Sequence, residues 1–387
     1  MKLTGYRREN GQFGIRNYLL ILPTSVCATD TAEKIAAQVP GAIAVPNQHG
    51  CCQIASDQAQ TQRTLEGFGK NANVGAVLVI GLGCDGIQAE KVAETIRVTG
   101  KPVEAITIQK CGGTLKAITV GAEIAAAMAA KLSVEKRTDG DLSDIILGME
   151  CGGSDPTSGL ASNPTIGYVS DKLVSIGGSS ILSETTEVIG AEHLLAARFA
   201  DPEQKTKFLT MVSNCEKRAI RLGEDLRSGQ PTPGNKAGGL STIEEKSLGC
   251  MYKAGNSPFT GALDYAEILP LDKKGLYFMD TPGQDIDSIT GMVAGGAQII
   301  VFSTGRGTPT GSPIAPVIKI TGNTDTFNNM KDNIDINAGR IITDGATIPQ
   351  IGEELFNMMI EVCNGKRTKA EVLGHREFGI YKVTGTF

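Results

Sequence analysis

The sequence predicts an α/β protein made of two Rossmann-like halves, each with a mainly parallel sheet covered by helices. Short apolar runs of strand length alternate with longer helical patterns along most of the chain. The 387 residues are too many for one ordinary core, so two domains are expected. The polar stretch 133–143, with its Thr-Asp-Gly turn, separates two alternating regions. We therefore predict a first α/β domain at 1–135 and a second at 140–387.

The first half carries four strands, each followed by a helical pattern. The run Tyr18–Leu22 is apolar and ends at Pro23, and Thr29 or Asp30 is a suitable cap for the helix that follows. Ala-rich residues 115–132 predict a long helix that closes this half. The expected strands are 18–22, 42–45, 74–82 and 103–108, and the expected helices are 29–38, 57–68, 88–98 and 115–132.

The second half begins with an apolar strand, which is followed by the loop Cys151-Gly152-Gly153-Ser154-Asp155. Residues 191–227 look helical, with a break at Asp201-Pro202, and 230–241 form a Pro/Gly-rich loop. Because ligands of parallel sheets bind beyond the carboxyl ends of the strands, we place the chemistry at such loops. The expected strands are 144–149, 179–183, 276–279, 298–302, 316–320 and 379–383, and further helices are expected at 164–175 and 349–364.

Composition excludes several classes of protein. The net charge is −5 and no long basic run occurs, which argues against nucleic acid as a partner. No stretch of 18 apolar residues and no leader-like amino terminus is present, so we expect a cytoplasmic protein without a membrane partner. The 48 glycines cluster after apolar runs, but they match neither a dinucleotide fingerprint nor a P-loop. They suit close approach of backbone amides to a small anionic substrate.

Nine cysteines, an odd count, argue against a disulfide framework. Cys51, Cys84 and Cys151 each follow an apolar run at a glycine-containing loop. The ends of the predicted strands could therefore bring these three cysteines together at one edge of a sheet. Three thiolates with an open fourth position suit a single metal ion or a substrate-binding iron–sulfur cluster. Three buried thiols behind glycine turns are the alternative, and the sequence leaves both open. Cys215, Cys250 and Cys363 have the pattern of ordinary buried cysteines.

Two basic side chains and a histidine are candidates for substrate contact or proton transfer. Lys236 is isolated among small residues in Pro-Gly-Asn-Lys-Ala-Gly-Gly, and Arg306 lies between two glycines, so either could clamp a carboxylate. His193 lies beside Glu187 and Glu192, where it could act as a base or be a helix-start histidine held by a carboxylate.

Three carboxylates after strand ends, Asp155, Glu184 and Asp280, could bind metal or substrate hydroxyls. Each could equally cap a helix. Arg16, before the first strand, is a weaker candidate of the same kind.

A set of motifs in fixed order resembles the catalytic region of the altronate/galactarate dehydratase family. The resemblance runs from about residue 5 to 365. Its motifs are GxRNYxxxLPT at 14–24, GC at 50–51, GLGC at 81–84, GGT at 112–114, CGGSD at 151–155, SETxExxGAEHLL at 183–195, PGNKAGGLxTxxEKSLG at 233–249, MDTPG at 279–283 and TGRGxxxG at 304–311. Asn47 stands where relatives often have a histidine, with His49 close by.

The resemblance implies a hydro-lyase that dehydrates a sugar acid to a 2-keto-3-deoxy acid, assisted by ferrous iron, an iron–sulfur cluster or another divalent metal. A close branch implies the alternative of a sulfolactate sulfo-lyase large subunit that releases sulfite. A non-catalytic sugar-acid-binding subunit is the alternative of another class. The family further implies either a separate small subunit of the SAF type or a divergent enzyme that does without one, and we expect a homo-oligomer.

Together, the resemblance and the loop positions suggest roles for twelve residues. The expected metal ligands are Cys51, Cys84 and Cys151; the expected catalytic residues are His193, Lys236 and Glu184; the expected substrate-binding residues are Arg16, Asn17, Ser154, Asp155, Asn235 and Arg306.

Overall fold

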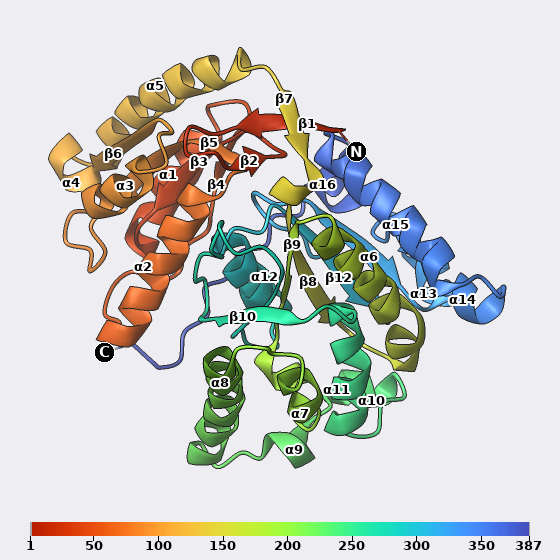
Figure 1. Ribbon diagram of the computed structural model, residues 1–387. Coiled ribbons are helices and arrows are strands. Elements are labelled where there is room, and N and C mark those ends of the chain that lie inside the picture. Colours follow the sequence, from red (N-terminus) through yellow and green to blue (C-terminus); the bar gives the residue numbers. More distant parts are fainter. Residues whose placement is uncertain (1, 387) are drawn as a thin grey trace.

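The computed structural model describes residues 2–386 and contains two parallel, helix-covered sheets joined by a small antiparallel one (Figure 1). The α/β prediction with mainly parallel sheets is therefore confirmed. The first sheet has the strand order β4-β3-β5-β6, all parallel. Its strands are β3 Tyr18–Pro23, β4 Ala42–Ala44, β5 Val74–Gly81 and β6 Val103–Thr107.

Helices cover both faces of this first sheet, which is why β5 is buried along its whole length and apolar throughout. On one face lie α1 Val26–Ala36 and α5 Thr114–Ser133, and on the other α2 Ala55–Lys70 and α3 Ala89–Arg97. The short α4 Ile108–Cys111 links β6 to α5.

The second sheet has seven parallel strands in the order β10-β11-β9-β8-β12-β13-β14. Its strands are β8 Ile146–Gly152, β9 Ser179–Leu182, β10 Phe259–Leu263, β11 Leu276–Met279, β12 Ile299–Thr304, β13 Val317–Thr321 and β14 Ile336–Asn337. The helices are α6 Asn163–Ser175, α7 Glu192–Ala196, α8 Pro202–Arg221, α9 Leu226–Gly229, α10 Pro233–Ala237, α11 Ile243–Met251, α12 Asp285–Ala294, α13 Thr324–Asn329, α14 Arg340–Thr343, α15 Ile348–Cys363 and α16 Lys369–Leu373.

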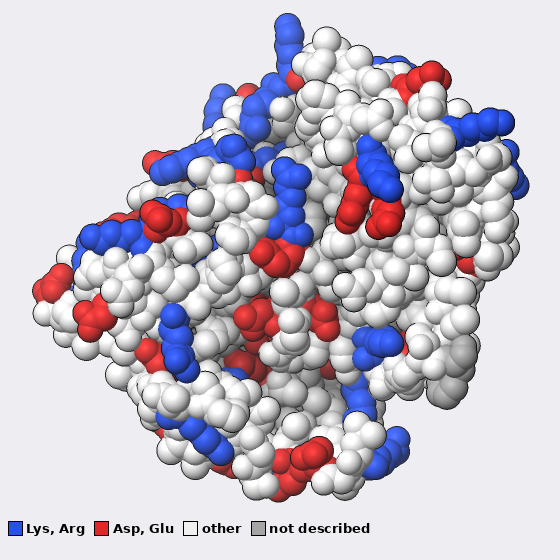
Figure 2. Space-filling view, turned by 180° about the vertical axis from the view of Figure 1, so that it is seen from behind, with Lys and Arg blue, Asp and Glu red and all other residues white. Residues whose placement is uncertain are grey.

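The site lies at the point where the strand order reverses. From β8 the chain proceeds to β9 on one side, and later returns to β12 on the other side. Loops at the carboxyl ends of such strands diverge and leave a crevice. Seen from behind, the molecule has a central hollow in which acidic side chains gather (Figure 2).

The two α/β units share one apolar core, because α2 of the first packs against α12 of the second. Gly67 permits this contact, since a Cβ there would lie 2.4 Å from the Ala294 carbonyl oxygen. Asn71 and Asn73 donate from their side-chain amides to backbone carbonyls of the second unit. The units are therefore firmly packed together.

Several sequence predictions differ from the structure. Part of the expected hinge forms β7, Thr138–Asp141, which pairs antiparallel with β1 Lys2–Arg7; β1 also pairs with β2 Phe13–Gly14. The strand expected at 379–383 is wrong: this tail contacts both units instead. The Tyr381 amide donates to the Tyr265 hydroxyl, and Asp57 accepts hydrogen bonds from the Val383 and Thr384 amides. Strand β8 runs on to Gly152, beyond the predicted end at Met149. Within residues 2–386, no helix is long and apolar enough to cross a membrane.

Candidate active site

The carboxyl end of β8 presents two reactive side chains to opposite faces of the sheet. Successive strand residues alternate in direction, so Glu150 faces α12 while Cys151 faces α6 and α11. Both side chains are buried, Glu150 at 0% and Cys151 at 1% exposure. The site is therefore built in two halves around this strand end.

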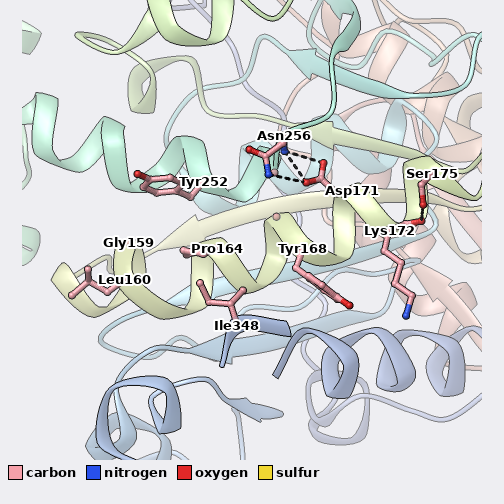
Figure 3. Close-up of a pocket in the computed structure, with 12 residues that line it drawn as sticks. Gly159, Leu160, Pro164, Tyr168, Asp171, Lys172, Ser175, Tyr252, Asn256 and Ile348 are labelled. Atoms are coloured by element: carbon pink, nitrogen blue, oxygen red, sulfur yellow. Dashed lines mark hydrogen bonds between the residues drawn. The ribbon is translucent and has the colours of Figure 1, made fainter. Parts of the chain in front are cut away.

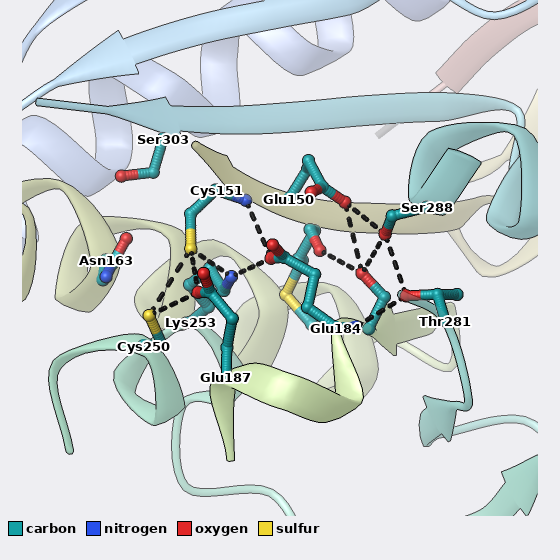
Figure 4. Close-up of polar contacts among 12 residues, drawn as sticks. Glu150, Cys151, Asn163, Glu184, Glu187, Cys250, Lys253, Thr281, Ser288 and Ser303 are labelled. Atoms are coloured by element: carbon teal, nitrogen blue, oxygen red, sulfur yellow. Dashed lines mark hydrogen bonds and ion pairs between the residues drawn. The ribbon is translucent and has the colours of Figure 1, made fainter. Parts of the chain in front are cut away.

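On the Cys151 side, two thiols and a carboxylate converge (Figure 4). The Cys151 and Cys250 sulfurs are 3.5 Å apart, and Glu187 Oε2 lies 2.8 Å from the first and 2.7 Å from the second. All three residues are buried. Two sulfur donors with one carboxylate oxygen form a donor set that suits a borderline-soft divalent metal such as ferrous iron or zinc.

Helix α11 and the turn after it place one cysteine and two lysines of the site on the same helical face. Lys246, Cys250 and Lys253 are spaced by four and then three residues, which is helical spacing. Lys253 Nζ lies 2.7 Å from Cys151 Sγ and 2.7 Å from Glu184 Oε2, and Lys246 Nζ lies 2.6 Å from Glu187 Oε1. Each buried carboxylate on this side thus has its own ammonium group.

Glu184 follows strand β9 and lies at the centre of the site. Its backbone has φ +72°, a left-handed conformation that costs free energy in a residue with a side chain. The conformation is held by the Glu184 amide, which donates to Thr281 Oγ1 at 2.7 Å. The Glu184 carboxylate then accepts from the Cys151 amide at 3.1 Å as well as from Lys253. Backbone strain at this position is consistent with a functional role.

Burial and ion pairing shift the pKa values of the carboxyl groups in this site in opposite directions. Burial alone would raise the pKa of Glu187, but Lys246 and Lys253 outweigh it and lower this pKa to about 2. Burial raises the pKa of Glu184, and the charge of Glu187 raises it further. Burial also raises the pKa of the Cys151 thiol well above its usual value. Burial would lower the pKa of Lys253, yet Cys151 and Glu184 raise it, so this lysine stays charged.

A small cavity leads to this cluster from the loop after β8. It has a volume of about 240 Å³ and is lined in part by Ser154, Asn163, Lys246 and Cys250. Asn235 joins α10 to the cluster, because it donates to the Ser154 carbonyl at 2.9 Å and accepts from Lys246 at 3.3 Å. The cavity is of a size for a small polar substrate.

The loops after β8 and β12 face each other across the crevice. The Arg306 amide donates to the Gly153 carbonyl at 3.0 Å, and its guanidinium donates to the Gly234 carbonyl at 2.9 Å. Asp155 caps the segment after it, because one carboxylate oxygen accepts from Thr157 and Ser158. Arg306 is exposed and keeps donors for a ligand, whereas Asp155 is largely used within the loop.

A wider cavity of about 740 Å³ runs along α6 and shares Gly159, Leu160 and Tyr252 with the smaller one (Figure 3). Its charged groups are already paired with protein. Asp171 accepts from the backbone amides of Asn256 and Ser257, and Lys172 pairs with Glu353 at 2.5 Å. The chemistry therefore belongs to the smaller cavity.

Among residues 2–386, the expected three-cysteine group does not form, because no metal-sized cluster joins Cys51 or Cys84 to Cys151. Cys51 and Cys84 are exposed at the carboxyl edge of the first sheet, where Cys51 Sγ lies 3.7 Å from Cys52 Sγ. Cys151 instead meets Cys250, which the sequence alone had suggested was an ordinary buried cysteine. Cys51 and Cys84 lie near the carboxyl ends of strands, as Cys151 does, but those strands belong to the first sheet and not to the second.

Two expected substrate-binding residues are used in packing: Arg16 between the two units, and Asn17 within the first. All five N–H donors of Arg16 are used, on Glu371 and on the carbonyls of Ile15, Val362 and Lys366. Asn17 accepts from Arg8 and donates to Glu135. Arg16 consequently has no donor left for a substrate carboxylate.

The exposed candidates His193 and Lys236 lie on α7 and α10. Neither side chain has a hydrogen-bond or ion-pair partner within the described part of the chain. The lysines in the cluster are Lys246 and Lys253, and sequence reasoning missed both. Their spacing with Cys250 on one helical face was the available signal.

Buried thiols, carboxylates and ammonium groups next to a cavity at the carboxyl ends of parallel strands are the arrangement expected of an enzyme active site. Two family descriptions match, "D-galactarate dehydratase/Altronate hydrolase, second domain" at residues 5–133 and "D-galactarate/Altronate dehydratase, C-terminal" at residues 142–386. The chain therefore belongs to the D-galactarate/altronate dehydratase family and is a lyase.

Individual relatives show two activities within this family. The altronate dehydratase of Bacillus subtilis is 36% identical over 98% of this chain and 77% of its own length. The (2R)-sulfolactate sulfo-lyase subunit beta of Chromohalobacter salexigens is 39% identical over 97% of this chain and 95% of its own length. The galactarate dehydratase (L-threo-forming) of Escherichia coli is 38% identical over 79% of this chain and 59% of its own length.

Proposed function

We propose that this enzyme eliminates water from a sugar acid of the altronate or galactarate type and yields a 2-keto-3-deoxy acid. In this reaction a base takes the C2 proton, the electrons of the C2–H bond form the C2=C3 double bond, and the C3 hydroxyl leaves and takes up a proton to become water. The resulting enol then converts to the keto acid. Such chemistry needs a base, a cation beside the developing enolate and help for the leaving group.

The observation that carries the proposal is the buried Cys151–Lys253–Glu184 contact at the end of β8 and β9. Burial raises the pKa of Glu184, which makes its carboxylate a stronger base for the C2 proton. Lys253, held charged beside it, is suited to stabilise the negative charge on the substrate. In this assignment Glu184 takes the role of base first expected of His193 or Lys236. Arg306 and Asn235 remain the proposed contacts for the substrate carboxylate, with Ser154 beside them.

Cys151, Glu187 and Cys250 are the proposed ligands of ferrous iron. Two thiols and a carboxylate, buried and within 4.8 Å of one another, fit such an ion. When bound, the metal would act as a Lewis acid toward the leaving hydroxyl. The three protein groups, together with Lys246 on Glu187, would fix its position and exclude water.

The metal proposal is tested by comparing cysteine variants after anaerobic purification. We expect Cys151→Ser and Cys250→Ser to lose iron, whereas Cys84→Ser retains it. Loss of iron from Cys84→Ser and Cys151→Ser, with iron retained in Cys250→Ser, would restore the Cys51–Cys84–Cys151 assignment. The ultraviolet–visible spectrum separates the two forms of iron, since a cluster absorbs strongly and a lone ferrous ion does not.

Release of sulfite from sulfolactate is the second candidate, favoured by the 39% identical sulfo-lyase subunit. The same base and ammonium group would serve, because only the group leaving C3 differs. Assays with altronate, galactarate and (2R)-sulfolactate, each followed by keto-acid formation and by sulfite release, separate the candidates. Absence of turnover with all three, even in the presence of iron and a small partner subunit, would favour the non-catalytic binding subunit.

A separate small subunit of the SAF type is part of the proposal. The relative named as a beta subunit supports an assembly of more than one kind of chain. Co-expression with such a subunit, followed by copurification and assay, tests it.

A further inference from the structure

A cavity of about 330 Å³ lies at the seam between the two α/β units, away from the candidate active site. Tyr6 and Tyr18 of the first unit and Ser312 and His375 of the second are among the residues that line it. Tyr18 begins β3, and Ser312 lies in the loop that precedes β13. Because β8 and β13 both run parallel to β12, the amino end of β13 lies at the opposite edge of the sheet from Cys151. The cavity is therefore separate from the site described above.

The charged residues of this cavity are mostly basic: Arg16, Arg137, Arg367 and Arg376, with Glu371 as the one carboxylate. Arg16 and Glu371 pair with each other at 2.8 Å. Within residues 2–386, Arg137, Arg367 and Arg376 have no carboxylate at ion-pair distance. The cavity thus holds three unpaired guanidinium groups, although the chain as a whole has a net charge of −5.

The three unpaired arginines come from separate segments of the chain. Arg137 directly precedes β7, Arg367 lies between α15 and α16, and Arg376 follows α16. The Arg137 guanidinium is fixed, because it donates to the Cys363 carbonyl at 2.8 Å and its central carbon lies 5.3 Å from the centroid of the Tyr6 ring. Arg367 and Arg376 are exposed and can turn toward a ligand. One fixed and two mobile cations therefore surround the cavity.

A buried hydroxyl at this cavity also lacks a partner. Ser312 is 6% exposed, and its Oγ is buried without a hydrogen-bond partner in the described part of the chain. Since a buried hydroxyl normally has such a partner, this one is available to donate to a ligand. The acidic neighbour Glu377 is already engaged, because it contacts His375 Nδ1 at 2.9 Å and accepts from the Gly311 amide at 2.8 Å.

We propose that this cavity binds a small molecule that carries a phosphate group. Guanidinium groups form paired, charge-assisted hydrogen bonds with phosphate oxygens. A phosphate monoester carries a charge of about −1.5 to −2 at neutral pH, whereas a carboxylate carries a single charge. Phosphate therefore neutralises three cations in less space. The ligand connects the segment before β7 to the segments after α15 and α16, and so strengthens the packing of the two units. This site goes beyond the proposed function, and its test does not depend on turnover.

The test measures pyrophosphate binding to the full chain, after a chelator has removed any metal that could take up the probe. Isothermal titration calorimetry in a phosphate-free buffer of low ionic strength should show one pyrophosphate per chain, and the melting temperature should rise. Arg367→Gln and Arg376→Gln should each weaken binding by about tenfold or more, and Ser312→Ala by about two- to tenfold. Citrate, a carboxylate anion of similar charge, should bind about tenfold more weakly than pyrophosphate.

Two arginine variants outside the cavity are the matched controls. Arg221→Gln removes the same charge at the exposed end of α8, and Arg306→Gln removes a guanidinium beside the candidate active site. Both should bind pyrophosphate as wild type does. The proposal is overturned if wild-type protein takes up no pyrophosphate, if both Arg367→Gln and Arg376→Gln bind as wild type does, if citrate binds as tightly as pyrophosphate, or if Arg306→Gln abolishes binding. The wild-type measurement decides even if a variant does not fold.

Discussion

Single residues at the end of β8 divide the work of the site. Cys151 faces the thiol and ammonium groups of α11, while the preceding residue, Glu150, faces the hydroxyls of α12. Lys253 connects β8 to the end of β9, because it contacts both Cys151 and the carboxylate of Glu184. The buried ammonium group of Lys253 thus compensates the charge of Glu184 and also supports the proposed chemistry.

Replacing Lys253 by methionine should remove activity and stability together. The loss of a charge beside the developing enolate should lower kcat by about 10²–10³-fold. Glu184 would be left buried without its partner, which costs about 3–5 kcal/mol of unfolding free energy. Steady-state kinetics and urea unfolding measure both effects.

The matched controls for Lys253→Met are Lys236→Ala and the double variant Lys253→Met/Glu184→Gln. Lys236 is exposed, so its loss should leave the unfolding free energy within about 0.5 kcal/mol of wild type. The double variant should regain stability without regaining activity. Recovery of activity in the double variant would contradict the assigned roles.

At the scale of elements, α11 carries the active groups because its backbone lies unusually close to the segment after β8. A Cβ at Gly249 would meet the Gly159 Cα at 3.3 Å, and the Asn163 side chain donates to the Gly249 carbonyl. This contact sets how far Lys246, Cys250 and Lys253 reach toward Cys151. Packing here therefore controls the geometry of the cluster.

Gly249→Val should disturb the site without touching its polar groups. The added methyl groups force α11 away from the Gly159 segment, which should cost about 1–3 kcal/mol and reduce activity and iron content. Gly229→Val, on α9 where the position is open, should change neither by much. Equal effects of the two substitutions on iron content would argue against control by this contact.

The start of α12 gives the molecule a pH dependence through Asp285. Burial raises its pKa from 3.8 to about 7, and the charges of Glu184 and Glu187 add to this effect, so they outweigh the helix dipole. A carboxyl with a raised folded pKa contributes stability that is fully present below its unfolded pKa. That contribution is lost as the pH rises through about 7.

In a metal-free buffer, wild type should therefore lose stability relative to Asp285→Asn between pH 4 and 8, by at most about 4 kcal/mol. Urea unfolding of both proteins at several pH values measures the difference. Parallel stability curves would show that Asp285 does not titrate in this window.

At the scale of the whole molecule, the sequence predicted the layers well because strands buried on both faces read as apolar runs, as in β5 and β12. It predicted Glu184, Cys151, Ser154 and Asn235 as site residues from their place after strand ends or in a Gly-rich loop, and the structure brings all four into or next to the cluster.

The rest could not be inferred, because it depends on which strands are neighbours. Cys84 and Cys151 have the same local pattern, yet they end strands of different sheets. Cys250 and Lys253 lie about 100 residues beyond Cys151, and only the folding of α11 over β8 brings them into contact. Local spacing carries no information on that placement.

The shared core predicts that the two α/β units unfold as one. Asn73 holds them together: its amide donates to the carbonyls of Gln298 and Ile314 at 2.8 Å each, and its oxygen accepts from the Ile15 amide. Asn73→Ala leaves these buried backbone groups unpaired, at about 1–3 kcal/mol for each. Asn10→Ala, in an exposed turn, is the control.

Hydrogen exchange followed by mass spectrometry tests this cooperativity. If the units share one unfolding transition, Asn73→Ala should reduce protection in β5 of the first unit and in β8 and β12 of the second by the same factor. Loss of protection confined to β5 would instead mean that the first unit opens alone. The active-site strands would then keep their stability, since Glu150, Cys151 and Glu184 all belong to the second unit.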